Sequence, residues 1–311
     1  MDFNLKNNYR WRALYILFIL LLFNIVSAEI KVPNGEIWLL VRGDDIGLCH
    51  GVNTGMEESY RNGILKSTEI MVPPAWFSEG VEICKRNPGL DVGIHLTLTS
   101  EWTNYKYKPV ALFDRKPNFI NEDGYFFPRT RNHPLFDNIF KEPYSLIASQ
   151  PKLENIEKEL RAQIEMAMQK IDNITHLSNH MLSMRATPEL ERLYKKLANE
   201  YNLVTDIEFR KESNTLQLFS VPAQEKVDSL ASMLTNIKPG FWYLVVHPGI
   251  DSPEMRAINA PTSDADMNMA QHRSAVTDAL TSEKIKKIIK ERNIKLVNHR
   301  DIIEAGLLER K

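Results

Sequence analysis

Cysteine is scarce in this chain, and neither sign of charge is in clear excess. Its 311 residues include only Cys49 and Cys84, too few for a disulfide framework. We expect two buried free thiols, and a single disulfide between them is the alternative. The formal net charge is −1, so the bulk electrostatics give no reason to expect binding to nucleic acid or to an anionic membrane. The expected partner is therefore neutral or small.

Long hydrophobic runs are also missing, except near the N-terminus. There the apolar run 13–26 follows three basic residues and is short for a membrane span of about 20 residues. Val26-Ser27-Ala28 supplies the small residues of a cleavage site, which is typical of a secretory signal peptide. We therefore expect residues 1–28 to be removed, and the alternative is an uncleaved N-terminal anchor. The mature chain would then be secreted or periplasmic, with no stable membrane span.

What the sequence does contain is an alternation of short apolar runs and amphipathic segments. With 43% hydrophobic residues, the chain can build a sizeable core. The apolar runs predict strands at 37–41, 67–72, 91–98, 175–180, 203–209, 241–247 and 294–298. The segments between them predict helices at 53–62, 76–86, 153–171, 188–201, 223–236, 270–280 and 282–292. Asn53 and Thr187 are the expected N-caps of two of these helices.

Repeated strand–helix units predict an α/β fold with a parallel sheet covered by helices. The number of units favours a closed or nearly closed barrel over an open doubly wound sheet. No G-x-G-x-x-G or Walker motif follows any predicted strand, which argues against a nucleotide-binding fold. We expect residues 29–311 to form a single domain, a deformed (β/α) barrel with about seven parallel strands.

Residues 100–150 interrupt the pattern after the third predicted strand and are rich in aromatic side chains. These are Trp102, Tyr105, Tyr107, Phe113, Phe119, Tyr125, Phe126, Phe127, Phe136 and Tyr144. A long insertion in a compact domain is usually functional or disordered, and the aromatic density argues against disorder. Because the insertion directly follows the strand that carries His95, we expect it to form a wall of the active-site cleft, where aromatic faces would suit sugar rings. The alternative is a hydrophobic flap that only packs on the barrel.

Acidic and imidazole side chains stand at the ends of four predicted strands. Asp44-Asp45 follows the first strand, and His95, His180 and His247 lie at the ends of later ones. Strand ends in such a fold converge on one face. One carboxylate and two imidazoles form a mixed oxygen and nitrogen set that suits Zn²⁺ or a similar divalent ion. Each histidine alone is more typical of a satisfied core residue, and only their common level on successive strands favours a metal site.

The adjacent carboxylates of Asp44 and Asp45 can serve different roles only if the chain turns there, because neighbouring residues of a strand face opposite ways. Gly43 and Gly47 permit such a turn. One carboxylate could then bind the metal, and the other could accept a proton from water that the metal activates. A simple turn or helix cap is the alternative for this pair. His247 could protonate a leaving amine, or it could be a structural histidine held by the Pro-Gly turn that follows.

Two further residues are weaker candidates. His176 lies four residues before His180 and on the same face of the predicted strand, but His180 is nearer the strand end and is the better ligand. Arg273 could orient a carboxylate or bind substrate, although an arginine on a helix surface is the ordinary case.

Together these motifs resemble the YdjC-like family of carbohydrate deacetylases, the chitooligosaccharide deacetylase group. The segments that carry the resemblance are 42–48, 51–53, 67–68, 71–72, 87–89, 93–99, 175–180, 247–249 and 280–282. They occur in family order over nearly the whole mature chain. The family implies a deformed (β/α) barrel, a divalent metal ion held by one Asp and two His, and hydrolysis of an N-acetyl group from a sugar.

Carried onto this chain, the resemblance assigns a role to each candidate. It implies that Asp45, His95 and His180 bind the metal ion, Zn²⁺ or Mg²⁺. It makes Asp44 the catalytic base that deprotonates the metal-activated water, and His247 the general acid.

The chain departs from the family pattern around the third ligand. Family members often have an Asp two residues before that ligand and Gln-His after it, whereas this chain has Ser178 and Met181-Leu182. An Asp there could hydrogen-bond a metal ligand, and a His would add a polar group to the cleft. Because the three ligands themselves are unchanged, the departures bear on the substrate more than on the chemistry.

The sequence therefore predicts a metal-dependent N-deacetylase acting on an N-acetylated sugar or oligosaccharide, without a nucleic acid partner and with a homodimer as a possible assembly. One alternative is a metal-independent glycosidase, which would use Asp44 or Asp45 with a distant carboxylate across the sugar bond. Another is a non-catalytic carbohydrate-binding protein that has kept the barrel and the aromatic insertion. The intact set of acidic and histidine residues argues against that second alternative.

Overall fold

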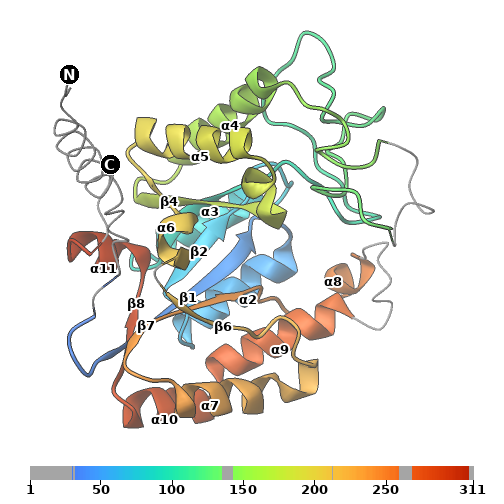
Figure 1. Ribbon diagram of the computed structural model, residues 1–311. Coiled ribbons are helices and arrows are strands. Elements are labelled where there is room, and N and C mark those ends of the chain that lie inside the picture. Colours follow the sequence, from blue (N-terminus) through green and yellow to red (C-terminus); the bar gives the residue numbers. More distant parts are fainter. Residues whose placement is uncertain (1–29, 31, 135–142, 212, 259–267, 308–311) are drawn as a thin grey trace, which may run out of the picture.

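The computed structural model describes residues 30, 32–134, 143–211, 213–258 and 268–307 (Figure 1). Its strands are β1 (Ile37–Ile46), β2 (Ser67–Ile70), β3 (Asp91–Leu96), β4 (Ile174–Asn179), β5 (Val204–Thr205), β6 (Asn214–Leu216), β7 (Gly240–Val246) and β8 (Ile294–Val297). Its helices are α2 (His50–Arg61), α3 (Phe77–Arg86), α4 (Leu153–Met168), α5 (Pro188–Glu200), α6 (Asp206–Lys211), α7 (Lys226–Asn236), α8 (Pro253–Ala257), α9 (Met269–Thr281), α10 (Glu283–Glu291) and α11 (His299–Glu304).

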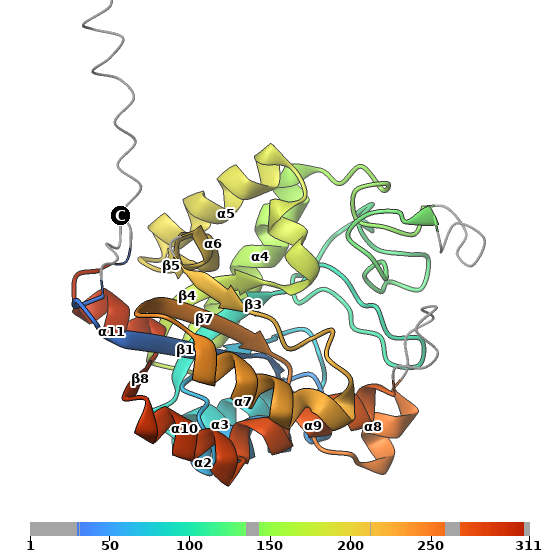
Figure 2. The same ribbon diagram turned by 60° about the horizontal axis from the view of Figure 1, so that its bottom comes forward.

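All the strands belong to one parallel sheet that curls into an incomplete barrel. The strand order is β5-β4-β3-β2-β1-β7-β6, and β8 pairs with the first half of β1. Among the described residues β5 and β6 do not pair with each other, so the barrel stays open between them. Helices pack around the outside of this curl, and in Figures 1 and 2 α4 and α5 lie above the strands whereas α7, α9 and α10 lie below them. The predicted parallel, deformed barrel is confirmed, although the sheet does not close.

Side chains along β1 alternate between two cores, as strand geometry requires. Leu39 and Val41 join the large apolar cluster shared with the surrounding helices. Leu40 joins a smaller cluster inside the curl, together with residues of β7 and β8. Arg42 and Asp44 continue this inner series toward the carboxyl end of β1, and both are buried. The interior therefore changes from apolar to charged as the strands approach their carboxyl ends.

Local predictions fail where polar side chains turn inward. The helix predicted from Asn53 begins earlier, at His50, because the buried Asn53 side chain accepts a hydrogen bond from the Gly47 amide (2.6 Å) instead of capping a helix. The strand predicted at 203–209 ends after Thr205, because Asp206 faces the interior, where the Tyr194 hydroxyl donates to it (2.9 Å). The short elements α6, β6, α8 and α11 were not predicted. The cap at Thr187 is confirmed, since its side chain accepts from the Leu190 amide.

The insertion between β3 and α4 lies across the carboxyl ends of the strands. Its side chains donate hydrogen bonds to backbone carbonyls that follow β1, β4 and β7: Tyr105 to Leu48 (2.7 Å), Thr130 to Met181 (2.9 Å) and Asn104 to Ala257 (3.2 Å). The Glu159 carboxylate of α4 accepts from the amides of Val110 and Ala111 (3.0 and 2.8 Å). These contacts hold the insertion over the mouth of the barrel.

Most aromatic side chains of the insertion are buried, and several of them join the main apolar core of the protein. Buried ones are Trp102, Tyr107, Phe119, Phe126, Phe127 and Tyr144, and partly buried ones are Tyr105, Phe113 and Tyr125. Phe136 lies outside the described residues. Most of these rings are therefore not exposed to stack on sugar rings, contrary to our expectation. Their main role is the packing expected of a hydrophobic flap.

Two predictions concern the cysteines and the membrane. Cys49 and Cys84 are buried free thiols, which confirms the simpler expectation. Across the described residues, no helix combines the length and the apolar character needed to cross a membrane. The expected signal peptide, residues 1–28, lies outside the described residues and stays a prediction.

Candidate metal centre and active site

The three predicted ligands meet where β1, β3 and β4 end. The Oδ1 atom of Asp45 lies 3.5 Å from Nε2 of His95 and 3.5 Å from Nδ1 of His180. All three side chains are buried, and their ligand atoms lie within 4.8 Å of one another. In a tetrahedral site with metal–ligand bonds of about 2.0–2.2 Å, neighbouring ligand atoms are about 3.4 Å apart. The spacing therefore fits a small divalent ion such as Zn²⁺.

The surroundings of Asp45, His95 and His180 also favour a positive charge between them. Oδ1 of Asp45 is buried without a hydrogen-bond partner among the described residues, which is costly for a carboxylate oxygen. Burial disfavours a charged His180, but Glu101 and Asp45 outweigh it and raise the pKa of His180 to about 10. A divalent ion bound between the three side chains would satisfy both features.

Asp45 turns away from the strand because its backbone leaves the extended conformation. Its φ is 84°, in the left-handed region that non-glycine residues rarely adopt. The register between β1 and β2 shifts at the same point, between Asp44 and Ile46. The turn expected from the flanking glycines is therefore present, and Gly47 also has a positive φ, of 98°. Gly43 serves packing instead, because a Cβ there would stand 2.3 Å from Sδ of Met56.

Hydrogen bonds fix which nitrogen of each histidine faces Asp45. Nε2 of His180 lies 3.0 Å from Oε2 of Glu101, so it donates to that carboxylate and Nδ1 is the nitrogen that faces Asp45. Nδ1 of His95 lies 2.7 Å from the Ser178 hydroxyl, which leaves Nε2 free. Both histidines thus direct one ring nitrogen at the same carboxylate oxygen while a polar group holds the other nitrogen, the arrangement that metal-binding histidines use.

Asp44 is held beside this group by Arg42. The Arg42 Nε and Nη2 atoms donate to Oδ1 and Oδ2 of Asp44 at 2.7 and 2.8 Å. Oδ2 of Asp44 lies 3.9 Å from Nε2 of His95. Because a carboxylate oxygen can accept more than one hydrogen bond, Asp44 keeps acceptor capacity on the side of the three ligands.

Arg273 of α9 is buried, whereas an arginine on a helix is ordinarily exposed to solvent. Its Nη2 donates to Oδ2 of Asp45 at 2.7 Å, and its Cζ lies 5.8 Å from the ring centre of Trp102. Three N–H groups are buried without a hydrogen-bond partner in the part of the chain that the structure describes: Nε and Nη1 of Arg273 and Nε1 of Trp102. Free donors therefore gather next to Asp45, where they could face oxygen atoms of a substrate.

His247 follows β7 in a turn that α9 holds in place. The Gly249 amide donates to the Thr277 hydroxyl (3.1 Å), and that hydroxyl donates to the Gly249 carbonyl (2.7 Å). Burial lowers the pKa of His247, although the nearby Asp45 favours its charged form. The ring centre of Phe219 lies 5.8 Å from that of His247. Because a lowered pKa leaves the ring mostly neutral at neutral pH, a role as general acid requires that His247 take up a proton during the reaction.

A second buried group, Glu69, His176 and His299, lies deeper inside the sheet. His176 contacts Glu69, and its ring stacks on His299 with 3.5 Å between the ring centres. Nδ1 of His299 lies 2.8 Å from the Ser67 hydroxyl, and Arg42 Nε lies 3.6 Å from Glu69. These side chains already pair with one another by hydrogen bonds and charge, and Arg42 supplies a cation. We therefore interpret the group as a structural network. His176 belongs to it and not to the three-ligand site.

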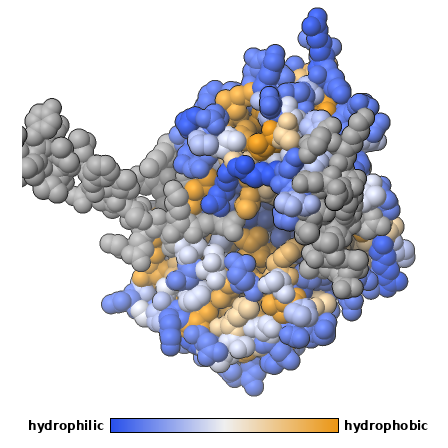
Figure 3. All heavy atoms as spheres, turned by 45° about the vertical axis from the view of Figure 1, so that its right-hand side comes forward, coloured by the Kyte–Doolittle hydropathy of each residue, from blue (hydrophilic) through white to orange (hydrophobic). Residues whose placement is uncertain are grey.

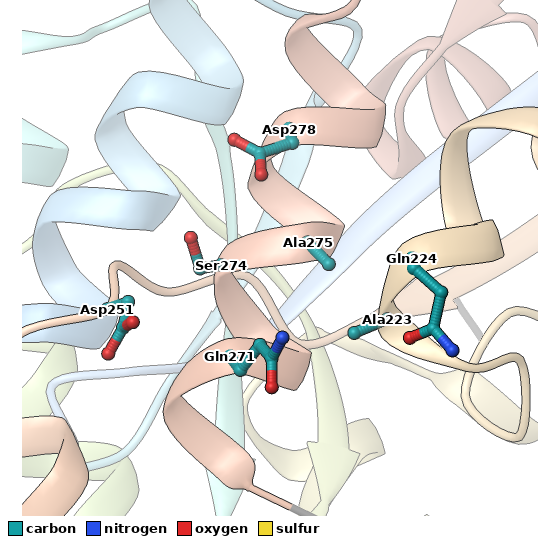
Figure 4. A pocket seen from close by; sticks show the side chains of 7 residues that line it. All are labelled: Ala223, Gln224, Asp251, Gln271, Ser274, Ala275 and Asp278. Carbon is teal, nitrogen blue, oxygen red and sulfur yellow. The ribbon is translucent and has the colours of Figure 1, made fainter.

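The molecular surface is hollowed on the side where the insertion and α8 lie. Figure 3 shows this side brought forward, with a hollow near its middle between hydrophilic atoms above and a band of hydrophobic atoms below. A separate shallow pocket opens on the exposed face of α9 (Figure 4), and it is lined by Ala223, Gln224, Asp251, Gln271, Ser274, Ala275 and Asp278. Arg273 and Thr277 are buried on the other side of the same helix, so the pocket is not part of the site.

Sequence reasoning missed the side chains that support the site. Arg42, Glu69, Glu101 and Ser178 were not identified as partners of the candidate residues, and Arg273 was only a weak candidate. A charged residue in an apolar strand, such as Arg42 or Glu69, needs a buried partner. That signal could have flagged these two, but it does not name the partner.

The fold and the site together define a parallel, barrel-like α/β protein with one Asp and two His in metal-binding geometry. Residues 38–291 match the family described as YdjC-like protein. The chain belongs to this family, as the motifs predicted.

Similar proteins are known from several bacteria. A carbohydrate deacetylase of Thermus thermophilus is 29% identical over 263 residues, covering 77% of this chain and 88% of the relative. A carbohydrate deacetylase of Thermoanaerobacter pseudethanolicus is 27% identical over 272 residues, covering 84% and 98%. A crystal structure of an Enterococcus faecalis protein matches with a TM-score of 0.66 at 21% identity, covering 86% of this chain and 99% of that one. This structural likeness supports the fold.

Proposed function

We propose that this protein is a metal-dependent carbohydrate N-deacetylase. The observation that carries the proposal is the buried Oδ1 of Asp45, which lies 3.5 Å from one ring nitrogen of His95 and 3.5 Å from one of His180. Asp44 stands beside this group, so a base and a set of metal ligands occur together. The relatives named carbohydrate deacetylase, which align over 77% and 84% of the chain, support the substrate class.

Each side chain then has a distinct task. Asp45, His95 and His180 would hold the ion, which supplies positive charge that activates the attacking water and stabilises the developing oxyanion. Asp44 accepts a proton on an oxygen that Arg42 keeps in place. His247 donates a proton to the departing amine nitrogen, from a turn that Thr277 fixes. We propose Zn²⁺ as the ion, because the ligand spacing fits tetrahedral coordination, and Mg²⁺ is the alternative.

The substrate we propose is an N-acetylated sugar or oligosaccharide that enters the hollow beside the insertion. Glu101 and Trp102, at the start of the insertion, contact or approach His180 and Arg273. The insertion therefore supports the site directly as well as covering the barrel. The free donor groups of Arg273 and Trp102 are available to the sugar or its acetyl oxygen.

We further propose that the enzyme acts outside the cytoplasm. The support is the basic start of the chain, its short apolar run and the small residues at Val26-Ser27-Ala28. N-terminal sequencing of protein from fractionated cells tests this, since it should find a chain that starts near Glu29 in the periplasm or medium. Full-length protein in the cytoplasm would contradict it. The possible homodimer stays a prediction.

Product analysis by mass spectrometry tests the reaction class. Incubation with N-acetylated oligosaccharides should give products that have lost acetyl groups while the chain length is unchanged. Shorter oligosaccharides would instead identify a glycosidase. Glycan binding without any product, by protein shown to hold zinc, would identify a carbohydrate-binding protein.

A further inference from the structure

Glu69 reaches across a neighbouring strand to the far side of a proposed metal ligand. Glu69 of β2 is in register with Gly93 of β3, and Gly93 is in register with His176 of β4. Because Gly93 has no side chain, the Glu69 carboxylate can cross β3 here and contact His176. A Cβ at position 93 would stand 2.4 Å from both Oε2 of Glu69 and Nε2 of His176. The glycine therefore keeps a passage open for the carboxylate.

The next inward-facing positions of β3 and β4 are His95 and Ser178, which are also in register. The Ser178 hydroxyl lies 2.5 Å from Oε2 of Glu69 and 2.7 Å from Nδ1 of His95. All three groups are buried, so water does not compete for these hydrogen bonds. A continuous path thus runs from the Glu69 carboxylate through one hydroxyl to the His95 ring.

The direction of this path follows from the chemistry of its members. An ionised carboxylate only accepts hydrogen bonds, so Ser178 must donate its single proton to Glu69. The Ser178 oxygen must then accept from His95, which places a proton on Nδ1. Nε2 of the neutral ring is left with its lone pair, and this atom faces Asp45 at 3.5 Å. Arg42, with its Nε 3.6 Å from Glu69, compensates the buried charge that sets this direction.

We propose that Glu69, acting through Ser178, is a positioning residue that holds His95 with Nδ1 protonated and Nε2 directed at the metal site. The inference rests on the proposed metal site. Glu101 does the same for His180 by direct contact. For His95, the carboxylate stands one hydroxyl further away, and Ser178 is the bridge. Where family members often have an Asp at position 178, this chain has Ser178, and Glu69 of β2 supplies the carboxylate instead.

Moving the carboxylate tests this relay. We would measure Zn²⁺ affinity by competition with a chromophoric chelator for Ser178→Ala, Glu69→Gln, Ser178→Asp and the Glu69→Gln/Ser178→Asp double variant. The two relay-breaking variants should each bind Zn²⁺ about 10–100-fold more weakly. S178D alone should weaken binding, because it puts a second carboxylate against Glu69. In the E69Q background the same substitution should strengthen binding, because the new carboxylate can accept from His95 directly.

The control is Asp91→Asn, which removes a buried carboxylate from the same interior. Asp91 contacts Ser67, Thr175, His176 and His299 but neither Ser178 nor His95, so Zn²⁺ affinity should be unchanged. Wild-type affinity in E69Q and S178A, or an S178D substitution that is harmful in both backgrounds, would overturn the relay. So would a variant D91N that loses as much affinity as E69Q.

A second measurement does not depend on metal binding. Nitrogen-15 NMR of the histidine side chains in metal-free protein should show the Nδ1-protonated tautomer of His95 in the wild type and a shift toward the Nε2-protonated form in S178A. An unchanged tautomer would overturn the relay. Failure of the wild type to bind Zn²⁺ would count against the proposed function, whereas the tautomer of His95 would still decide the role of Glu69.

Discussion

Arg273 Nη2 donates to Oδ2 of Asp45 at 2.7 Å, and this contact divides the carboxylate between two tasks. Oδ2 is bound to the guanidinium, whereas Oδ1 faces His95 and His180 and has no other partner among the described residues. The charge of a proposed metal ligand is thus partly balanced before any ion binds. Arg273 also lowers the pKa of Asp45 against the opposing effect of burial, so the carboxylate is ionised at neutral pH.

Removal of the Arg273 guanidinium should destabilise the metal-free protein. In Arg273→Met, the buried Asp45 loses its compensating charge, which typically costs about 3–5 kcal/mol of unfolding free energy. Saturating Zn²⁺ should recover part of this loss, because the ion binds only the folded chain. Urea denaturation with chelator and with Zn²⁺ measures both values. Arg256→Met is the control, because it breaks an exposed pair with Asp251 and should change the stability little. Equal effects of the two substitutions would contradict the role of Arg273.

Asp44→Asn should separate metal binding from catalysis. The substitution keeps the shape of the side chain but removes the proton acceptor, so turnover should fall by about 10²–10⁴-fold. Zn²⁺ affinity should stay near that of the wild type, because Asp44 is not one of the three proposed ligands. Asp45→Asn is the matched comparison and should lose both. Steady-state kinetics and zinc titration of the two variants provide the test, and full activity of the Asp44 variant would remove Asp44 as the base.

His299 should make the stability of the fold depend on pH. Burial, helped by the nearby His176, lowers the pKa of His299 to about 4, while Asp91 opposes the shift. A depressed pKa means that the stabilisation is complete above about pH 6.5 and is lost as the pH falls toward 4. Over this window the wild type should lose up to about 3 kcal/mol more than His299→Gln. Chemical denaturation at a series of pH values checks this, and parallel curves for the two proteins would contradict it.

Gly93→Ala should disturb the interior although it adds only a methyl group. The new Cβ would stand 2.4 Å from both Glu69 and His176, and overpacking of this kind costs about 1–3 kcal/mol. The control is Gly89→Ala, whose Cβ would meet only the hydroxyl end of Tyr60, which can move aside. Thermal denaturation of both variants gives the comparison. A Gly93 variant as stable as the Gly89 variant would show that the carboxylate does not need the passage.

The sequence predicted those features that depend on local pattern. Apolar runs ending in Asp or His located β1, β3, β4 and β7, and each proposed ligand stands directly at such an end. The alternation of these runs with helices was enough to predict a parallel, barrel-like sheet.

The missed features depend on pairing in space. Arg273 is 228 residues from Asp45, and the contact between Ser178 and Glu69 spans 109, so no local pattern reports either pair. The predicted strand 203–209 ends before Asp206, because the Asp206 side chain accepts a hydrogen bond from Tyr194 inside the barrel. The aromatic residues of the insertion looked like a binding surface, but most of them are buried, and several join the main apolar core.

The most direct test of the central claim is acetate release from a panel of N-acetylated sugars and oligosaccharides. The account predicts release by the Zn²⁺-loaded protein, its loss after chelation, its return when Zn²⁺ is restored, and its absence in Asp45→Asn. Release that persists in protein shown to be free of metal would contradict the metal-dependent mechanism. No release from any member of the panel by protein shown to hold Zn²⁺ would contradict the N-deacetylase itself.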